Sequence, residues 1–394
     1  MSITAAQGFR AAGVRAGLKA SGRADLALVV NDGPLDVAAG VFTTNRVAAA
    51  PVTFSRAAVA DGHARAVILN SGSANACTGP QGAADAAATA AHVATLLGLP
   101  EATDVLVCST GVIGVPLDMP LLLDGAAAAV DALTAEERGA HEAATAIMTT
   151  DTVSKEDALT LSTADGATWH LGGMIKGVGM LAPGLATMLC VLTTDAVVDP
   201  TGAQAALARA TARTVNRISS DGCMSTNDTV LMLASGASGA VPSQAELDAA
   251  VTQVLGLLSR RLVADAEGAT HDIAITVSGA VSEAAAEAAA RTVSSSNLLK
   301  CAVAGEDPNW GRVLSQLGTV PAEVCPFDPD EVDVAINGVT VFSHGGLGED
   351  PATVDMTPRE TRIDILLAEG DAQATVWTND LTHGYVTINA DYHT

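Results

Sequence analysis

The chain has 394 residues, of which 48% are apolar, and its formal net charge at pH 7 is −24. This length exceeds what one simple core fills, so we expect two or three closely packed lobes. The apolar content excludes general disorder. A nucleic-acid binder needs a basic surface, and 20 basic against 44 acidic residues exclude that class.

The chain begins Met1-Ser2-Ile3-Thr4-Ala5, without the basic and apolar regions of a secretory signal. No apolar run approaches the ~20 residues that span a bilayer. The six cysteines form no C-x-x-C pair, which indicates free and mostly buried thiols. The eight histidines lack the spacing of metal ligands. We therefore expect a cytoplasmic protein that binds no metal, membrane or nucleic acid.

In the first half, short apolar runs alternate with loops of small polar residues. The pattern predicts strands at 26–30, 40–43, 65–69 and 104–108, helices at 81–97, 121–133 and 135–148, and a hairpin over 157–172. Loops are predicted at 70–76 and 109–114. Such loops at strand ends either bind ligands, since their N–H groups can face an anion, or are structural turns.

The second half continues the same irregular alternation, which predicts an α/β fold of layered mixed sheets with helices. Expected helices cover 204–217, 247–264 and 283–293, and expected strands cover 188–192 and 273–277. Polar loops are predicted at 219–229 and 301–312, followed by a sheet-like tail over 385–394. Within the second loop, we expect Asp307, Asn309 and Arg312 to hold the loop together.

The central stretch, residues 172–190 (GGMIKGVGMLAPGLATMLC), combines glycines, one lysine and a Pro-Gly step before an apolar run. Gly177-x-Gly179-x-x-Ala182 matches a dinucleotide fingerprint, but that motif needs a helix to begin inside it. Pro183-Gly184 would break such a helix after one turn. A P-loop is excluded because no Gly-Lys-Ser/Thr run occurs here. The remaining interpretation is that Thr187 is a nucleophile.

A threonine hydroxyl needs a base before it can attack. The α-amino group of an N-terminal threonine, with a pKa of ~8, can be that base. Thr187 is internal, so this chemistry requires the Ala186-Thr187 bond to be cut first, by attack of Thr187 Oγ on the Ala186 carbonyl. Lys176 would be a nearby cation that holds a carboxylate or stabilises developing charge. Residue chemistry alone leaves a purely structural Thr187 open.

The segment K-G-x-G-M-x-x-P-x-L-A-T-M-L, residues 176–189, resembles the self-cleavage signature of the ornithine acetyltransferase (glutamate N-acetyltransferase) family of arginine biosynthesis. Ordered matches continue along the whole chain, at 41–46, 70–77, 108–114, 146–152, 225–229, 267–270, 307–312 and 389–394. The chain departs from the usual pattern at Ser73, Val178, Gly184, Cys223 and Met224, none of which is a catalytic position of the family.

The resemblance implies a self-cleaving fold of the N-terminal-nucleophile type that needs no cofactor. Cleavage at Ala186-Thr187 would give an α chain, 1–186, and a β chain, 187–394, which stay together as an α2β2 heterotetramer. The implied reaction moves acetyl from N2-acetyl-L-ornithine to L-glutamate in a ping-pong cycle through an acetyl-threonine ester. Some members of the family also use acetyl-CoA, which no residue of this chain decides.

The resemblance also assigns site residues. Thr187 would be the nucleophile, and the Thr110 hydroxyl and the Gly111 N–H would form the oxyanion hole. The implied substrate-binding residues are Thr150, Lys176, Thr187, Glu267, Asn389 and Thr394. Glu267 would attract the ornithine ammonium or act on the attacking amine.

Two other classes of function stay open. An amidohydrolase or aminopeptidase with an N-terminal nucleophile would use the same groups with water as acceptor. A binding protein with an inactive site would keep one uncut chain.

Overall fold

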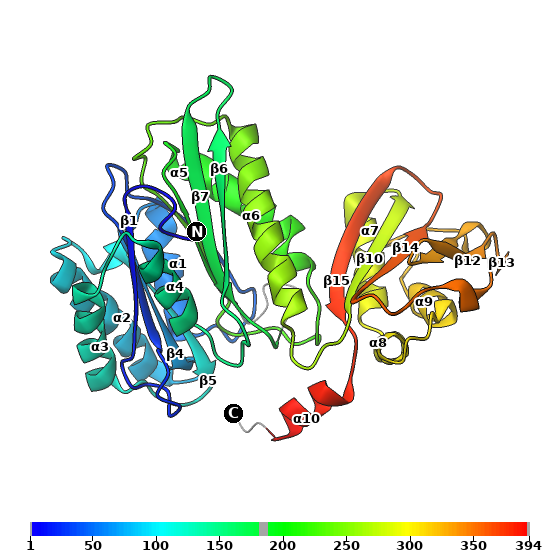
Figure 1. Ribbon diagram of the computed structural model, residues 1–394, viewed down its shortest axis with the longest axis horizontal. Helices are drawn as coiled ribbons and strands as arrows, with labels where there is room; N and C mark the ends of the chain where they lie inside the picture. Colours follow the sequence, from blue (N-terminus) through cyan, green and yellow to red (C-terminus); the bar gives the residue numbers. More distant parts are fainter. Residues whose placement is uncertain (1, 181–187, 392–394) are drawn as a thin grey trace.

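The computed structural model describes residues 2–180 and 188–391. These residues form three β-sheets with helices packed against them (Figure 1), so the expected fold of layered mixed sheets is confirmed. In the described part of the chain, no helix is both long and apolar enough to cross a membrane.

The first two sheets face each other. The four-stranded sheet has the order β1 (Phe9–Val14), β2 (Leu26–Asn31), β4 (Ala66–Ser73) and β5 (Val105–Val112). The five-stranded sheet has the order β3 (Val37–Phe42), β9 (Thr229–Ala234), β8 (Leu189–Thr194), β7 (Thr168–Lys176) and β6 (Lys155–Ser162). One buried core contains Val29, Leu69 and Leu106 from the first sheet with Met174 and Val191 from the second. Because burial of such side chains dominates folding, this core fixes the two sheets against each other.

Helices cover the outer faces of both sheets. Apolar residues of α2 (Gly79–Leu97) and α3 (Met119–Asp131) form one cluster with the first sheet, and those of α5 (Pro200–Arg213) and α6 (Gln244–Ala264) form another with the second. The result is a four-layered α/β/β/α body. Two shorter helices, α1 (Ala50–Ala58) and α4 (Glu137–Ala146), also pack on the first sheet.

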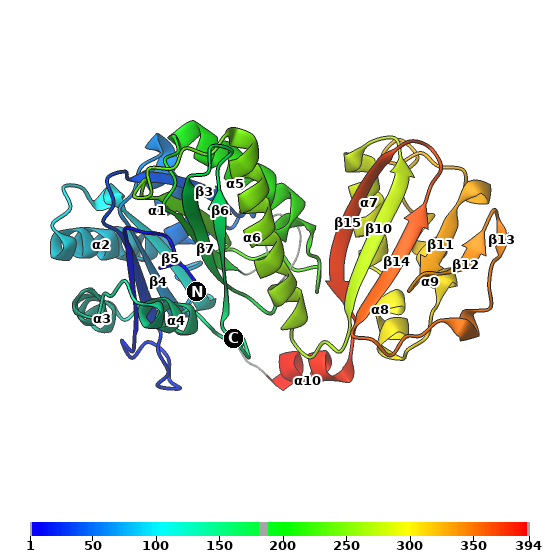
Figure 2. The same cartoon turned by 45° about the horizontal axis from the view of Figure 1, so that its top comes forward.

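The third sheet belongs to a separate part of the molecule. Its order is β13 (Gly346–Leu347), β12 (Val339–Ser343), β11 (Asp333–Ile336), β14 (Glu360–Leu366), β10 (Asp272–Ala280) and β15 (Ala372–Asn379), as Figure 2 shows. Its buried face packs with α7 (Glu283–Ser294), α8 (Asn297–Ala304) and α9 (Trp310–Leu317). In β14, buried Ile363 and Ile365 alternate with exposed neighbours, the pattern of a sheet with one solvated face.

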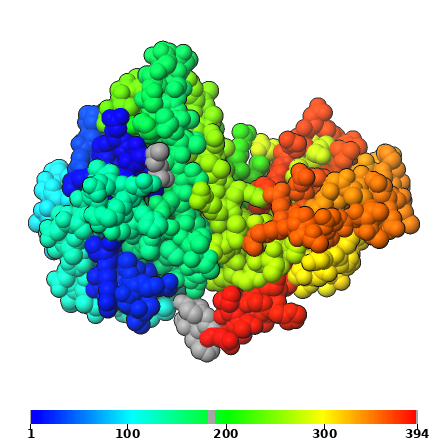
Figure 3. Space-filling model, viewed as in Figure 1, coloured from blue at the N-terminus to red at the C-terminus, as the bar shows by residue number. Residues whose placement is uncertain are grey.

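The chain then returns from β15 toward the junction between the two parts through α10 (His383–Asp391), seen at the bottom of Figures 1 and 3. The expected sheet-like tail is therefore wrong over residues 385–391. The β-branched run from Val386 to Ile388 favours a strand, but it has no strand partner in the described chain. The Thr382 hydroxyl instead accepts a hydrogen bond from Tyr385 N, 3.1 Å away, and donates one to Gly268 O.

Other boundaries also differ from the sequence-based expectation. Residues 70–73 and 109–112 are not loops but the ends of β4 and β5, which pair in parallel up to Ser73 and Val112. The expected loop at 301–312 contains the end of α8 and the start of α9, where Asn309 caps the helix by accepting from Arg312 N. Short 3-10 turns occupy Val59–Asp61, Ala102–Asp104, Val215–Arg217, Pro329–Glu331 and Pro351–Thr353.

The cysteines are free, as expected, but only half of them are buried. Cys108, Cys190 and Cys325 are buried, and Cys77, Cys223 and Cys301 are exposed. Apolar neighbours in sequence did not predict burial, because Cys301 is exposed within α8 while Cys325 is buried outside any helix or strand.

Candidate active site

A cavity of about 270 Å³ opens where the two facing sheets, the junction and α10 meet. Six of the sequence-predicted site residues line it together: Thr110, Gly111, Thr150, Lys176, Glu267 and Asn389. Ala186, Thr187 and Thr394 lie outside the described residues. The remaining lining residues are Thr149, Val178, Gly179, Met180, Asp221, Cys223 and Tyr385.

Lys176 and Thr110 connect the two facing sheets at the base of this cavity. Lys176 ends β7 and lies opposite Leu189, the first residue of β8. Its Nζ donates to Thr110 Oγ1, 3.1 Å away in β5, and both side chains are buried. Since the Thr110 oxygen accepts this bond, its own hydrogen is available to a substrate oxygen. This is the arrangement that an oxyanion hole needs.

A buried charge cluster surrounds Lys176. Burial lowers the pKa of Lys176, and the nearby Asp151 carboxylate opposes that shift. Asp151 accepts from Gly177 N at 2.8 Å and from Lys155 Nζ at 2.6 Å. Burial alone would raise the pKa of Asp151, but the charges of Lys176 and Lys155 outweigh it and lower the pKa to about 2. Asp151 therefore stays ionised at neutral pH and keeps a negative charge beside Lys176.

Lys155 extends this cluster toward the segment that carries Glu267. Its Nζ lies 2.5 Å from Asp265 Oδ2, two residues before Glu267, and its side chain has no exposed surface. No sequence pattern predicted a role for Lys155, Asp151 or Asp265. The only sequence signal for these residues was the dense polar run at 149–152. An ion pair between residues 110 positions apart leaves no local pattern in the sequence.

Glu267 lies where three distant segments converge. Its Oε1 accepts from Thr150 Oγ1 and its Oε2 accepts from Asn389 Nδ2, both at 3.0 Å. Its backbone N donates to Val178 O at 3.1 Å. A Cβ at Gly179 would lie 3.0 Å from Glu267 Oε2, so a glycine at this position allows the close approach. The carboxylate thus faces the cavity as a site for a cation or an amine.

Two carboxyl groups hold the chain on either side of residues 181–187. Met180 N donates to Asp221 Oδ2 at 2.6 Å, and Met188 N donates to Asp228 Oδ1 at 3.0 Å. Asp228 is fully buried, and its Oδ2 has no hydrogen-bond partner in the described chain. Burial raises the pKa of Asp228 well above its usual value, and the Met188 N–H opposes that shift. The sequence predicted a polar loop at 219–229 and a family match at 225–229, but it indicated no role for either carboxyl group.

Comparison with known proteins shows which family shares this chain's sequence. The model of the ArgJ family matches residues 10–394. The chain belongs to the ArgJ family. It is 59% identical over 394 residues to the arginine biosynthesis bifunctional protein ArgJ of Bifidobacterium longum, with both chains fully covered. The Streptomyces coelicolor protein of the same description is 55% identical over 392 residues, again with full coverage of both.

Among solved structures, the ornithine acetyltransferase of Mycobacterium tuberculosis, complexed with ornithine, is 53% identical. That match covers 48% of this chain and 96% of the solved chain, with a TM-score of 0.44. Membership of the ArgJ family makes this protein an acyltransferase of arginine biosynthesis, as the sequence resemblance predicted.

Proposed function

We propose that this ArgJ-family protein transfers acetyl from N-acetylornithine to glutamate through an ester on Thr187. The observation that carries the proposal is the convergence of Thr110, Lys176 and Glu267 on one cavity. β8 begins at Leu189, which pairs with Lys176 at the end of β7, and Thr187 precedes Leu189 by two residues in the sequence.

The first step is self-cleavage. Thr187 Oγ attacks the Ala186 carbonyl carbon, the C–N bond breaks, and the hydroxyl proton ends on the Thr187 nitrogen. Water then hydrolyses the ester, which leaves a carboxylate on Ala186 and a free α-amino group on Thr187. That amino group becomes the base for later turnover.

In turnover, the α-amino group takes the Thr187 hydroxyl proton while Oγ attacks the acetyl carbonyl of N-acetylornithine. The amide bond breaks and ornithine leaves with the proton; the glutamate amine then attacks the ester and regenerates the hydroxyl. Thr110 and the Gly111 N–H stabilise the oxyanion, a contribution of ~3–4 kcal/mol per donor. Lys176 holds the α-carboxylate, and Thr150, Glu267, Asn389 and Thr394 contact the rest of the substrate.

The sheet explains why the two chains would stay together after the cut. β7 of the 1–186 chain and β8 of the 187–394 chain are neighbours, paired from Leu171 with Thr194 to Lys176 with Leu189. We propose that they remain associated and assemble as an α2β2 heterotetramer in the cytoplasm. Use of acetyl-CoA as a second acetyl donor belongs to the same proposal, because the donor changes while the acetyl-threonine ester is unchanged.

The test is ornithine release from N-acetylornithine with and without glutamate. Transfer predicts sustained release only when glutamate is present, because the ester accumulates without an acceptor. Sustained release that ignores glutamate would establish an amidohydrolase instead. Thr187→Ala, as the matched variant, is expected to stay one chain on a denaturing gel and to release nothing.

A further inference from the structure

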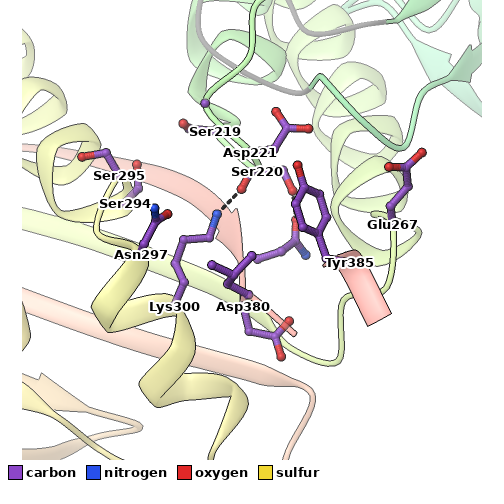
Figure 4. Close-up of a pocket in the computed structure, with 13 residues that line it drawn as sticks. Ser219, Ser220, Asp221, Glu267, Ser294, Ser295, Asn297, Lys300, Asp380 and Tyr385 are labelled. Atoms are coloured by element: carbon purple, nitrogen blue, oxygen red, sulfur yellow. Dashed lines mark hydrogen bonds between the residues drawn. The ribbon is translucent and has the colours of Figure 1, made fainter. Parts of the chain in front are cut away.

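A second cavity of about 260 Å³ adjoins the candidate active site and shares Asp221, Glu267 and Tyr385 with it. Figure 4 shows it between the loop at Ser219 and Ser220 and the start of α8. It therefore lies at the junction of the two parts of the molecule. Of the site residues that the resemblance implies and the structure describes, Glu267 alone lines it.

Lys300 of α8 points into this cavity, and only 6% of the residue is exposed. Among the described residues that line the cavity, it carries the only positive charge. Its Nζ donates to Ser220 O, and a lysine ammonium has two further N–H donors. Burial lowers the pKa of Lys300, while the charges of Asp221 and Asp380 oppose that shift. The ammonium is thus a partly desolvated cation with donor capacity left for a ligand.

The neighbouring carboxylates already have donors of their own. Asp380 accepts from Thr270 N at 2.9 Å and from His271 N at 3.1 Å, and in Figure 4 its carboxylate lies away from the Lys300 ammonium. Asp221 accepts from Met180 N. Lys300 is therefore the cation available to pair with an anionic group that enters the cavity.

The proposed reaction, on which this inference rests, requires two substrates with opposite side-chain charges. Ornithine ends in an ammonium, and glutamate ends in a carboxylate. The Glu267 carboxylate attracts the ammonium of ornithine and repels the side-chain carboxylate of glutamate, because charges interact more strongly where burial excludes water. Glu267 therefore cannot bind the side chains of both substrates.

We propose that glutamate, the acetyl acceptor, binds with its γ-carboxylate beyond Tyr385, at Lys300. N-acetylornithine, the acetyl donor, binds with its side-chain ammonium at Glu267. The shared wall of Asp221, Glu267 and Tyr385 then separates two arms of one site. Lys300 is the residue that makes the enzyme specific for an acidic acceptor.

The test measures the two half-reactions separately in the Lys300→Met variant. We expect the KM for glutamate to rise roughly 10–100-fold, the cost of a lost charge-assisted hydrogen bond. The KM for N-acetylornithine, measured from the first release of ornithine, should stay within about threefold, and Lys300→Arg should restore part of the loss. Arg312→Met is the matched control, because Arg312 also donates to a backbone carbonyl, that of Leu298 in α8, but lies outside the cavity.

A second variant does not disturb the Ser220 contact. Asn297→Asp adds a carboxylate at an exposed cavity position at the start of α8, so it should also raise the KM for glutamate alone. An unchanged KM for glutamate in both variants, or equal increases in both KM values, would overturn the assignment. A wild-type enzyme that releases no ornithine would instead contradict the proposed function.

Discussion

Asp228 is a buried carboxyl whose environment favours the neutral form. Asp228→Asn keeps an acceptor for Met188 N, whereas Asp228→Ala leaves that N–H buried and unpaired. We expect the alanine variant to be about 1–3 kcal/mol less stable than the asparagine variant. Chemical denaturation of both variants measures the difference, and equal stabilities would contradict the role of the hydrogen bond.

The raised pKa of Asp228 also predicts that the stability of the protein depends on pH. Because its folded pKa is raised above the ordinary 3.8, Asp228 binds its proton more tightly in the folded state. Its contribution to stability is complete below pH 3.8 and is lost as the pH rises through the raised value. Wild type should therefore lose stability relative to Asp228→Asn as the pH rises over that range. A constant difference would show that the pKa of Asp228 is the same in the folded and unfolded states.

Asp151 has the opposite linkage. Its folded pKa of about 2 lies below the ordinary 3.8, so its contribution is present above pH 3.8 and is lost as the pH falls toward 2. Asp151→Asn breaks the buried pair with Lys155, which we expect to cost about 3–5 kcal/mol at neutral pH. Unfolding experiments at neutral and acid pH check this. A small loss at neutral pH would mean that Lys155 is sufficiently stabilised by Asp265.

At the scale of elements, the position of α10 depends on a close backbone contact. Gly268 has a φ of +65°, and a Cβ there would lie 2.3 Å from Tyr385 N. Gly268→Ala should displace α10, move Asn389 away from Glu267, and reduce kcat/KM at least about tenfold, as a loss of substrate positioning does. Gly338→Ala is the matched control, because it has a φ of +85° but nothing within 4 Å of the added Cβ. Equal activity in both variants would contradict the role of α10.

Sequence patterns predicted the elements whose cause is local. The glycine after residue 97 adopts the left-handed conformation that ends α2, and the apolar spacing of α6 matches its buried face. The ends of β4 and β5 were missed because parallel pairing, not local propensity, keeps Ser71 and Thr110 extended. The tail was missed because contacts with Gly268, a distant residue, select helix over strand.

The site residues divide in the same way, into those with a local sequence signal and those without one. Two family-like segments, 108–114 and 176–189, led to Thr110 and Lys176, whose side chains form a hydrogen bond in the structure. Lys155, Asp221 and Lys300 carry no motif, and their importance depends on partners far away along the chain. Resemblance to a family predicts which positions contact substrate, but it does not identify the charged residues around those positions.

At the scale of the whole molecule, the cavity is built from both facing sheets and from the C-terminal helix. Thr110 comes from the first sheet, Lys176 from the second, and Asn389 from α10. A cut after Ala186 would leave each chain with only part of this set. Separately expressed 1–186 and 187–394 chains are therefore expected to be inactive alone.

The central claim is that Thr187 first cuts its own chain and then carries acetyl. Mass spectrometry of the purified protein after incubation with N-acetylornithine, without glutamate, tests both roles at once. We predict two chains, the second beginning at Thr187 and heavier by one acetyl group that glutamate removes. An active enzyme that stays one uncut chain, or that carries acetyl on another residue, would contradict the account.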